Sequence, residues 1–162
     1  MNIVKKVTNS LRQDGISGFL TKVKKHFYNE EKSEYYKWIK ENTPSERELK
    51  EQAKYKFKYE PKISIVVPLY NTPKKYLLEL IKYVQKQTYS NWELCFADGS
   101  TEPLSFVEPI ANKDSRIKYK ILKENKGISG NTDEALKMVT GDYVALLDHD
   151  DLIPFNSLYE IV

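Results

Sequence analysis

Two aspartates near the end of the chain have the spacing of a metal site. Asp148 and Asp150 stand two residues apart, directly after the apolar run Tyr143–Leu147. A chain that leaves a strand loses its strict alternation, so both carboxylates can turn toward one ion. Carboxylates suit Mg²⁺ or Mn²⁺, which proteins hold through a few carboxylates plus substrate phosphates. We therefore expect a divalent-metal site at Asp148 and Asp150. His149 is a candidate third ligand, but the alternation of its neighbours favours a side chain that points away or touches substrate.

The same acidic turn has a simpler explanation, in which solvated carboxylates cap a helix expected near Pro154. An EF-hand calcium loop is excluded. With the two aspartates at its first and third positions, Leu152 would be the fifth and Ile153 would replace the obligatory glycine. The metal hypothesis is favoured because the turn follows an expected buried strand, and because other polar clusters end neighbouring strands.

Those other clusters suit the recognition of a nucleotide. Asp98 ends the run Trp92–Ala97, where its carboxylate can accept an imide N–H from a base or close a turn with Gly99. Tyr70 can stack on a base or line the core. Separately, Asn125, Gly127, Ser129 and Asn131 open an expected helix, whose free N–H groups either attract phosphate or are simply capped.

Strands and helices alternate from residue 62 onward. The β-branched and apolar runs predict strands at 62–67, 92–97, 117–122 and 143–147, and helices at 76–84, 104–111 and 129–139. Pro68 is expected to end the first strand. Such alternation predicts an α/β fold with a mostly parallel sheet, in which ligands bind beyond the carboxyl ends of the strands. Three polar clusters fall at those ends, at residues 68–71, 98–100 and 148–150.

The first 60 residues form a basic extension of different composition. Residues 1–62 hold 15 Lys/Arg and 9 Asp/Glu, a net charge of +6, whereas residues 63–162 hold 11 and 14, a net of −3. Helical spacing predicts helices at 16–27, 34–41 and 45–57, the last with a capping box of Ser45 and Glu48. Such basic helices either pack on protein or contact a membrane surface peripherally. We expect two parts, 1–60 and 61–162.

Composition excludes several classes of protein. The single cysteine, Cys95, excludes a disulfide framework and a cysteine-based zinc site. The sequence has no apolar run of about 18 residues and no signal peptide, which favours a cytoplasmic protein, with the inner membrane face as an alternative. It also lacks a G-x-G-x-x-G or P-loop motif. A net charge of +3 and the lack of interleaved aromatics argue against a nucleic-acid partner.

Taken together, these residues resemble a known family. The segments ISIVVPLYNTPKKYLLELI, QTYSNWEL, DGST, NKGISGNTDEAL and GDYVALLDHDD resemble the GT-A glycosyltransferases of family 2, over roughly residues 62–162. The preceding YYKWIKENTPSERELKEQAKYKFKYEPK is similar to the lead-in of bacterial members that build surface polysaccharides. The resemblance implies a Rossmann-like half that binds a nucleotide-sugar donor, dependence on Mn²⁺ or Mg²⁺, inversion at the anomeric carbon, and a glycan or lipid-linked glycan acceptor.

The resemblance also implies roles for individual residues. Asp98 would bond the base imide, which fits UDP-sugars and dTDP-sugars equally. Asp148 would hold ribose or metal, and Asp150 would be the principal metal ligand. The implied donor-binding set is Pro68, Leu69, Tyr70, Asn71, Asp98, Asn125, Gly127, Asn131, Asp148 and His149.

Three positions depart from the family's pattern. Ala97 stands where the family often has a first aspartate, Asp133 where it commonly has asparagine, and Tyr83 where it usually has a small residue. In the family the acceptor-binding half and the general base follow the acidic turn. We therefore expect the base beyond Val162, and residues 61–162 to be the donor-binding subdomain without the acceptor half.

Two alternatives stay open at this point. One is a phosphotransferase of the haloacid dehalogenase type, with Asp148 as nucleophile. Its motif would follow the first strand, whereas here it follows the fourth and Leu152 occupies the fifth position. The other is a non-enzymatic domain that docks through its basic helices.

Overall fold

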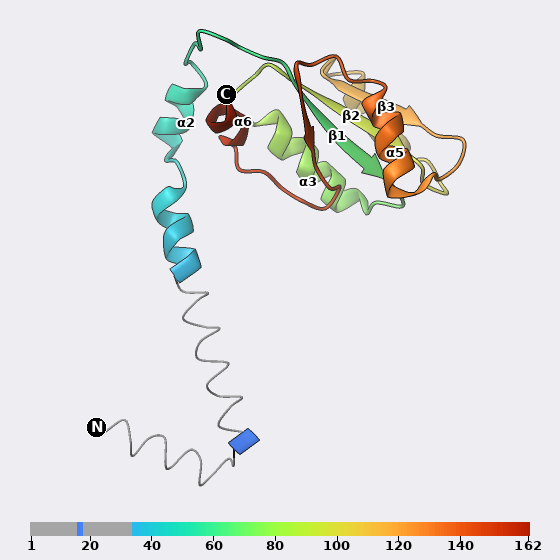
Figure 1. Ribbon diagram of the computed structural model, residues 1–162, viewed down its shortest axis with the longest axis horizontal. Coiled ribbons are helices and arrows are strands. Elements are labelled where there is room, and N and C mark those ends of the chain that lie inside the picture. The colour runs from blue at the N-terminus through green and yellow to red at the C-terminus, as the bar shows by residue number, and fades with distance from the viewer. Residues whose placement is uncertain (1–15, 18–33) are drawn as a thin grey trace. The chain divides into compact units, whose positions relative to one another are not determined.

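The computed structural model describes residues 16–17 and 34–162 (Figure 1). The chain divides into two compact units, Met1–Thr43 and Pro44–Val162. In the first unit residues 34–42 form a helix that ends before Pro44, as predicted. All but the first two residues of the helix expected at 16–27 lie outside the described residues. None of the described helices has the length and apolar character that crossing a membrane requires.

The second unit opens with α2 (Glu46–Gln52), and its predicted capping box is confirmed. The Ser45 amide donates to the Glu48 carboxylate at 2.7 Å, and the Glu48 amide donates back to Ser45 Oγ at 3.3 Å. The helix ends five residues before the predicted end at Phe57. The Phe57 ring instead packs edge-on against Tyr89, with ring centres 5.7 Å apart, at the border of the core. The domain boundary expected at residues 60–61 stays a prediction.

Four parallel strands confirm the predicted α/β fold (Figure 1). They lie in the order β3-β2-β1-β4. Their bounds are β1 (Ile63–Leu69), β2 (Trp92–Asp98), β3 (Ile117–Ile121) and β4 (Tyr143–Leu146). Because β1, β2 and β3 step in one direction and β4 returns to the other side of β1, the order reverses between β1 and β4.

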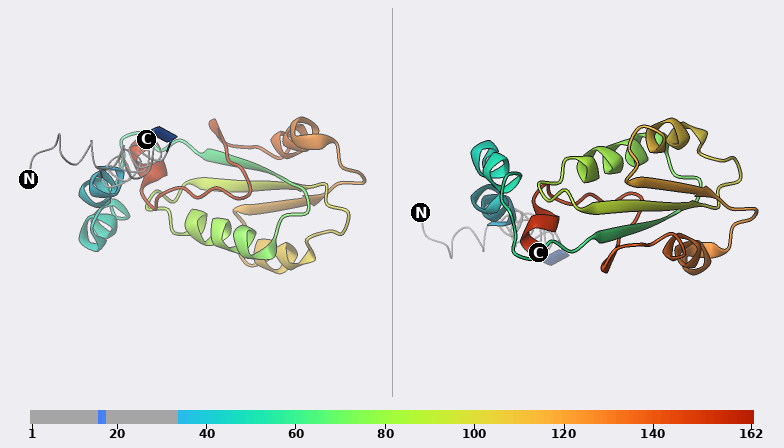
Figure 2. Two further views of the ribbon diagram at one scale, coloured as in Figure 1. Left: turned by 90° about the horizontal axis from the view of Figure 1, so that it is seen from below. Right: turned by 90° about the horizontal axis from the view of Figure 1, so that it is seen from above.

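Helices cover both faces of this sheet (Figure 2). One face carries α3, η1 and α4, the other carries α5, and α6 ends the chain. Their bounds are α3 (Lys74–Gln85), η1 (Ser105–Val107), α4 (Glu108–Ala111), α5 (Gly127–Leu136) and α6 (Ser157–Ile161). Successive side chains of a strand point to opposite faces, so β1 and β2 fill two cores. The larger lies under α3, and the smaller joins Val66, Cys95 and Ala97 to Ala135 of α5. Burial there raises the pKa of the Cys95 thiol to about 11.

Pro68 does not end β1, contrary to expectation, because it lies inside the strand and is paired with Ala97 of β2. Alternate residues of a parallel strand bond the same neighbour. The Val66 carbonyl accepts from the Leu147 amide, so Pro68 also faces the β4 side. The β1–β4 pairing ends at Val66 and Leu146. At Pro68 no neighbouring strand is paired on that side, so the absence of an N–H group costs the sheet no hydrogen bond.

The expectation of a buried fourth strand is also wrong. β4 has four residues, and Tyr143, Val144 and Leu146 are 58%, 47% and 70% exposed. The strand lies at the edge of the sheet and pairs with β1 alone. Its apolar side chains lack the neighbours on both sides that make β1 and β2 buried.

Candidate functional site

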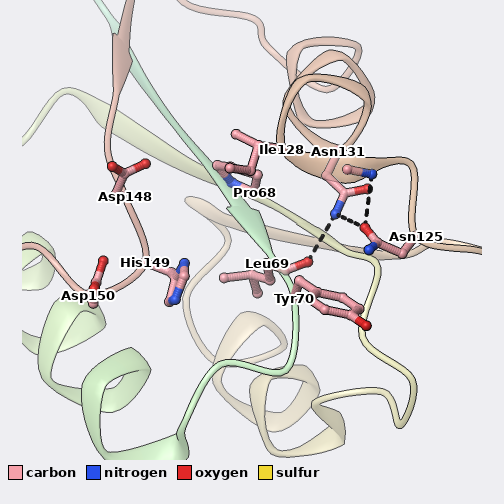
Figure 3. Close-up of a pocket in the computed structure, with 10 residues that line it drawn as sticks. Pro68, Leu69, Tyr70, Asn125, Ile128, Asn131, Asp148, His149 and Asp150 are labelled. Atoms are coloured by element: carbon pink, nitrogen blue, oxygen red, sulfur yellow. Dashed lines mark hydrogen bonds between the residues drawn. The ribbon is translucent and has the colours of Figure 1, made fainter.

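A cavity of about 260 Å³ lies at the carboxyl ends of β1 and β4 (Figure 3). This is where the strand order reverses, the place at which open α/β sheets bind ligands. All the predicted donor and metal residues except Asn71 and Asp98 line it. The lining residues are Pro68, Leu69, Tyr70, Asn125, Gly127, Ile128, Asn131, Asp148, His149 and Asp150.

The cavity exists because β4 parts from β1. The Leu147 amide donates to the Val66 carbonyl at 3.1 Å, one residue beyond the paired strands. Beyond this hydrogen bond the two segments separate. The chain after β1 runs toward Tyr70, and the chain after β4 runs toward the turn 148–150 (Figure 3). The residues expected at two strand ends therefore face one another across a gap.

The acidic turn forms one side of the cavity, opposite Asn125 and Asn131 (Figure 3). Asp148 and Asp150 are exposed, His149 is half-buried, and all three line the cavity. Among residues 16–17 and 34–162, no group of three or more His, Cys, Asp or Glu could hold a metal ion. The two carboxylates suit a hard cation, but such an ion would need further oxygens from a bound substrate.

The segment after the turn is anchored to the end of α3. Gln87, which is buried, donates from Nε2 to the Pro154 carbonyl at 2.7 Å and accepts from the Leu158 amide at 3.1 Å. The Thr88 amide donates to the Phe155 carbonyl at 2.8 Å. The acidic turn is thus a short span between β4 and a clamped segment.

A network of amides builds the opposite wall. Asn131 is 1% exposed, and its Nδ2 donates to the Leu69 carbonyl at 3.2 Å and to Asn125 Oδ1 at 3.0 Å. Its Oδ1 accepts from the Lys126 amide at 3.0 Å. Asn125 Oδ1 also accepts from the Gly127 amide at 3.0 Å. Asn125 and Asn131 therefore fix the start of α5 against the end of β1.

Two glycines let this wall close. Gly127 has φ +74°, a left-handed conformation that glycine adopts without steric cost. A Cβ on Gly99 would lie 2.7 Å from Asn131 Nδ2, closer than real contacts allow. Glycine at position 99 is therefore needed for the close approach of the β2 end to Asn131.

Asp98 and Asn71 lie outside the cavity lining and brace a loop. Asp98 is 1% exposed, and its carboxylate accepts from the amides of Ser100 at 2.9 Å and Leu104 at 2.8 Å and from the Tyr119 hydroxyl. Burial and the hydrogen bond to Asp98 raise the pKa of Tyr119 well above its ordinary value. Both oxygens of Asp98 are thus engaged by protein donors. Its contact with a base stays a prediction.

Asn71 joins the ends of β1 and β2. Its backbone has φ +49°, its amide donates to Ser100 Oγ at 2.8 Å, and its Oδ1 accepts from the Thr101 amide at 3.1 Å. These bonds hold the loop after β2 beside the loop after β1. A contact of Asn71 with base or ribose likewise stays a prediction.

Ile128 lines the cavity although the sequence did not single it out. It is 80% exposed in the first turn of α5, so packing does not explain an aliphatic side chain there. The sequence offered one signal for Ile128, its position between Asn125 and Asn131 in the segment expected to face the ligand. Asp133, the family departure nearest this wall, is exposed and is not part of the lining.

Residues 64–162 match the family described as glycosyl transferase family 2. The chain belongs to this family. The predicted resemblance is therefore confirmed, and family 2 membership decides against a phosphotransferase of the haloacid dehalogenase type.

The relatives that this chain matches are longer, and it spans less than half of their length. Protein y4gI of Sinorhizobium fredii is 40% identical over 105 residues, which are 63% of this chain and 12% of that protein. The Escherichia coli enzyme WfgD, named UDP-Glc:alpha-D-GlcNAc-diphosphoundecaprenol beta-1,3-glucosyltransferase, is 36% identical over 96 residues, 59% of this chain and 38% of that protein. The crystal structure of S. aureus TarS 1-349 matches with a TM-score of 0.56 and 29% identity, over 62% of this chain and 31% of that one.

Proposed function

We propose that the cavity binds the nucleotide diphosphate of a nucleotide-sugar donor, linked to UDP or dTDP, for transfer of its sugar to a glycan or lipid-linked glycan. One observation carries the proposal: in a family 2 chain, an acidic pair and the start of a helix face one cavity where the strand order reverses. The name of WfgD, which specifies a UDP-glucose donor and a diphosphoundecaprenol-linked acceptor, supports it.

Each wall would contact a different part of the donor. Tyr70 is 48% exposed at the rim and would stack on the base. The first turn of α5 would face the diphosphate through its unpaired N–H groups. The Gly127 amide already bonds Asn125, so the amides that follow it would make this contact.

Asp148 and Asp150 would hold Mn²⁺ or Mg²⁺ together with the oxygens of the diphosphate. When bound, the cation would neutralise charge that develops on the leaving diphosphate. The two exposed carboxylates are hard oxygen ligands and fit such an ion.

Base recognition by Asp98 sets a geometric demand. A carboxylate offers about four acceptor positions, and three are filled by Ser100, Leu104 and Tyr119. An imide N–H of uracil or thymine would take the remaining one. The donor would then bind against the loop 99–104.

Transfer also needs a base within hydrogen-bond reach of the acceptor hydroxyl. We propose that this base lies beyond residue 162, that transfer inverts the anomeric carbon, and that residues 61–162 act in donor binding. By itself the chain would transfer sugar poorly, and rapid turnover with a defined acceptor would contradict this.

Contact of the basic extension with a membrane is a separate proposal, tested by co-sedimentation of residues 1–60 with anionic vesicles.

Isothermal titration with UDP and dTDP, with and without Mn²⁺, tests the donor site. We expect binding that depends on Mn²⁺ and is lost in Asp150→Asn. The control is Asp151→Asn, an exposed neighbour outside the lining, which should bind like the natural chain. No binding heat with either nucleotide in the presence of Mn²⁺, or unchanged binding in Asp150→Asn, would contradict the proposal.

A further inference from the structure

β4 has little of the side-chain burial that normally fixes a strand, because three of its four side chains are exposed and Ala145 is only half-buried against the core. It pairs with β1 over four residue pairs, from Ile63 with Tyr143 to Val66 with Leu146. A slip of one residue would turn every side chain of β4 to the other face of the sheet. Asp148 and Asp150 would then leave their places at the cavity, so any interaction that helps to hold the register also helps to place these two carboxylates.

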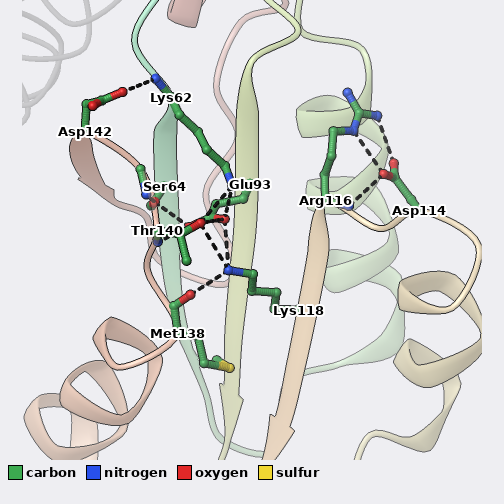
Figure 4. A network of polar contacts seen from close by, with 10 residues as sticks. Lys62, Ser64, Glu93, Asp114, Arg116, Lys118, Met138, Thr140 and Asp142 are labelled. Atoms are coloured by element: carbon green, nitrogen blue, oxygen red, sulfur yellow. Dashed lines mark hydrogen bonds and ion pairs between the residues drawn. The ribbon is translucent and has the colours of Figure 1, made fainter.

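The loop that leads into β4, residues 140–142, is bonded to the sheet at the amino ends of its strands, away from the cavity (Figure 4). The Thr140 amide and hydroxyl donate to the Glu93 carboxylate at 2.6 and 2.7 Å. The Gly141 amide donates to Ser64 Oγ at 2.9 Å. The Asp142 amide donates to the Lys62 carbonyl, and the Lys62 amide donates to the Asp142 carboxylate, both at 2.7 Å. Three consecutive residues, 140–142, are thus tied to β2, to β1 and to Lys62, the residue before β1.

Glu93 lies at the centre of this network. Its side chain is 1% exposed and pairs with Lys62 Nζ at 2.6 Å and Lys118 Nζ at 3.0 Å. Burial opposes its ionisation, but hydrogen bonds from Lys62, Ser64 and Thr140 prevail and hold the pKa of Glu93 well below its ordinary value. Lys118 also donates to the Met138 carbonyl at 2.7 Å. The charged carboxylate therefore joins β1, β2 and β3 to the β4 entry.

The seat of this loop accepts only glycine at position 141. A Cβ there would lie 2.5 Å from the Lys62 carbonyl and 2.6 Å from Ser64 Oγ. The backbone of Gly141 therefore lies too close to Lys62 and Ser64 for a side chain at this position.

We propose that Glu93 and Thr140 are positioning residues, which fix the register of β4 on β1 and so place Asp148 and Asp150 at the cavity. The residues act from the end of the strand opposite to the ligand. The effect on ligand binding rests on the proposed function, whereas the effect on register does not.

The register is measured first, without ligand, by nuclear Overhauser contacts between β1 and β4 in the 162-residue chain. Thr140→Val keeps the volume but loses the hydroxyl that bonds Glu93 and accepts from Lys62 at 2.8 Å. We expect weakened contacts between Ile63 and Tyr143 and between Ser64 and Val144. Thr140→Ser, which keeps the hydroxyl, should restore them.

Asp114→Asn is the matched control. Asp114 accepts from Arg116 Nε at 3.0 Å and Nη2 at 2.9 Å, beside β3 and away from the β4 loop (Figure 4). Asp114→Asn removes a carboxylate that pairs with a basic side chain, as Glu93→Gln does. The variant should therefore have a lower free energy of unfolding, while its β1–β4 contacts stay unchanged. Full β1–β4 contacts in folded Thr140→Val would overturn the proposal.

Mn²⁺ affinity with UDP, measured by electron paramagnetic resonance, is the second readout. If one molecule in ten keeps the competent register, the apparent Kd rises about tenfold. We expect this rise in Thr140→Val and in Glu93→Gln, but not in Thr140→Ser or Asp114→Asn. Unchanged affinity in both Thr140→Val and Glu93→Gln would overturn the proposal. A natural chain that binds no Mn²⁺ with UDP would instead refute the proposed function and leave the register test valid.

Discussion

The two walls of the cavity are held in place by different physics. On one wall, buried Asn131 and the buried strands β1 and β2 fix the start of α5 through neutral hydrogen bonds. On the other, exposed β4 carries the acidic turn, and the charged pairs of Glu93 hold its entry. The first wall depends on neutral hydrogen bonds among buried groups. The second depends on an ionised carboxylate at the end of the sheet away from the cavity (Figure 4).

Core truncation should separate the two walls most strongly. Phe96 of β2 is fully buried, so Phe96→Ala should cost about 3–5 kcal/mol of unfolding free energy. Leu146 of β4 is 70% exposed, and Leu146→Ala should change it by less than about 0.5 kcal/mol. Urea unfolding followed by circular dichroism measures both. Similar losses in the two variants would show that β4 is buried in solution.

Removal of the amide network should give the next largest effect. Asn131→Ala leaves the Leu69 carbonyl and the Lys126 amide without their partner, at a cost of about 2 kcal/mol. The control, Asp133→Ala, changes an exposed side chain of the same helix and should stay within about 0.5 kcal/mol. Chemical unfolding of the two variants decides, and equal stabilities would mean that the network does not hold the wall.

Acid should act on the two walls differently. The folded pKa of Glu93 lies below the unfolded value, so its contribution is complete above about pH 4.3 and declines as the pH falls toward the folded pKa. Between pH 4 and 3 the natural chain should therefore lose up to about 1.4 kcal/mol more than Glu93→Gln. Urea unfolding at both pH values tests this. A parallel decline in the two proteins would rule out a charged Glu93 as the source.

Backbone strain at Gly127 should give the smallest of these losses. A Cβ there would meet no neighbour, so Gly127→Ala should cost about 1 kcal/mol through its φ of +74° alone. Gly127→Asn should cost less, because asparagine tolerates the left-handed conformation better. Thermal unfolding compares the two variants. A larger loss in the asparagine variant would point to a clash instead of strain.

The sequence was sufficient to predict most of the side chains that share the cavity, but it missed Ile128 and included Asn71 and Asp98, which lie outside the lining. Asp148 and Asn131 lie far apart in the chain, but parallel strands bring their carboxyl ends to one edge. It was insufficient for β4, because an apolar run looks alike in a central strand and at an edge. Pro68 stayed within β1 because β4 had already departed, which depends on tertiary structure.

Asp98 shows the same limit at a polar residue. A carboxylate at a strand end predicts an acceptor, but the sequence does not say which donors are nearer. The amides of Ser100 and Leu104 and the Tyr119 hydroxyl reach it first. Local loop geometry therefore gives Asp98 a structural role whose partners the sequence alone did not predict.

The buried thiol of Cys95 has a practical consequence. It is the single cysteine of the chain, fully enclosed, with a pKa raised to about 11. Thiolate is the reactive form, so maleimide reagents at neutral pH should spare it. A cysteine introduced at exposed Leu146 could then carry a spectroscopic label without replacement of the native one. The label would then report on β4 alone, because the native cysteine does not react.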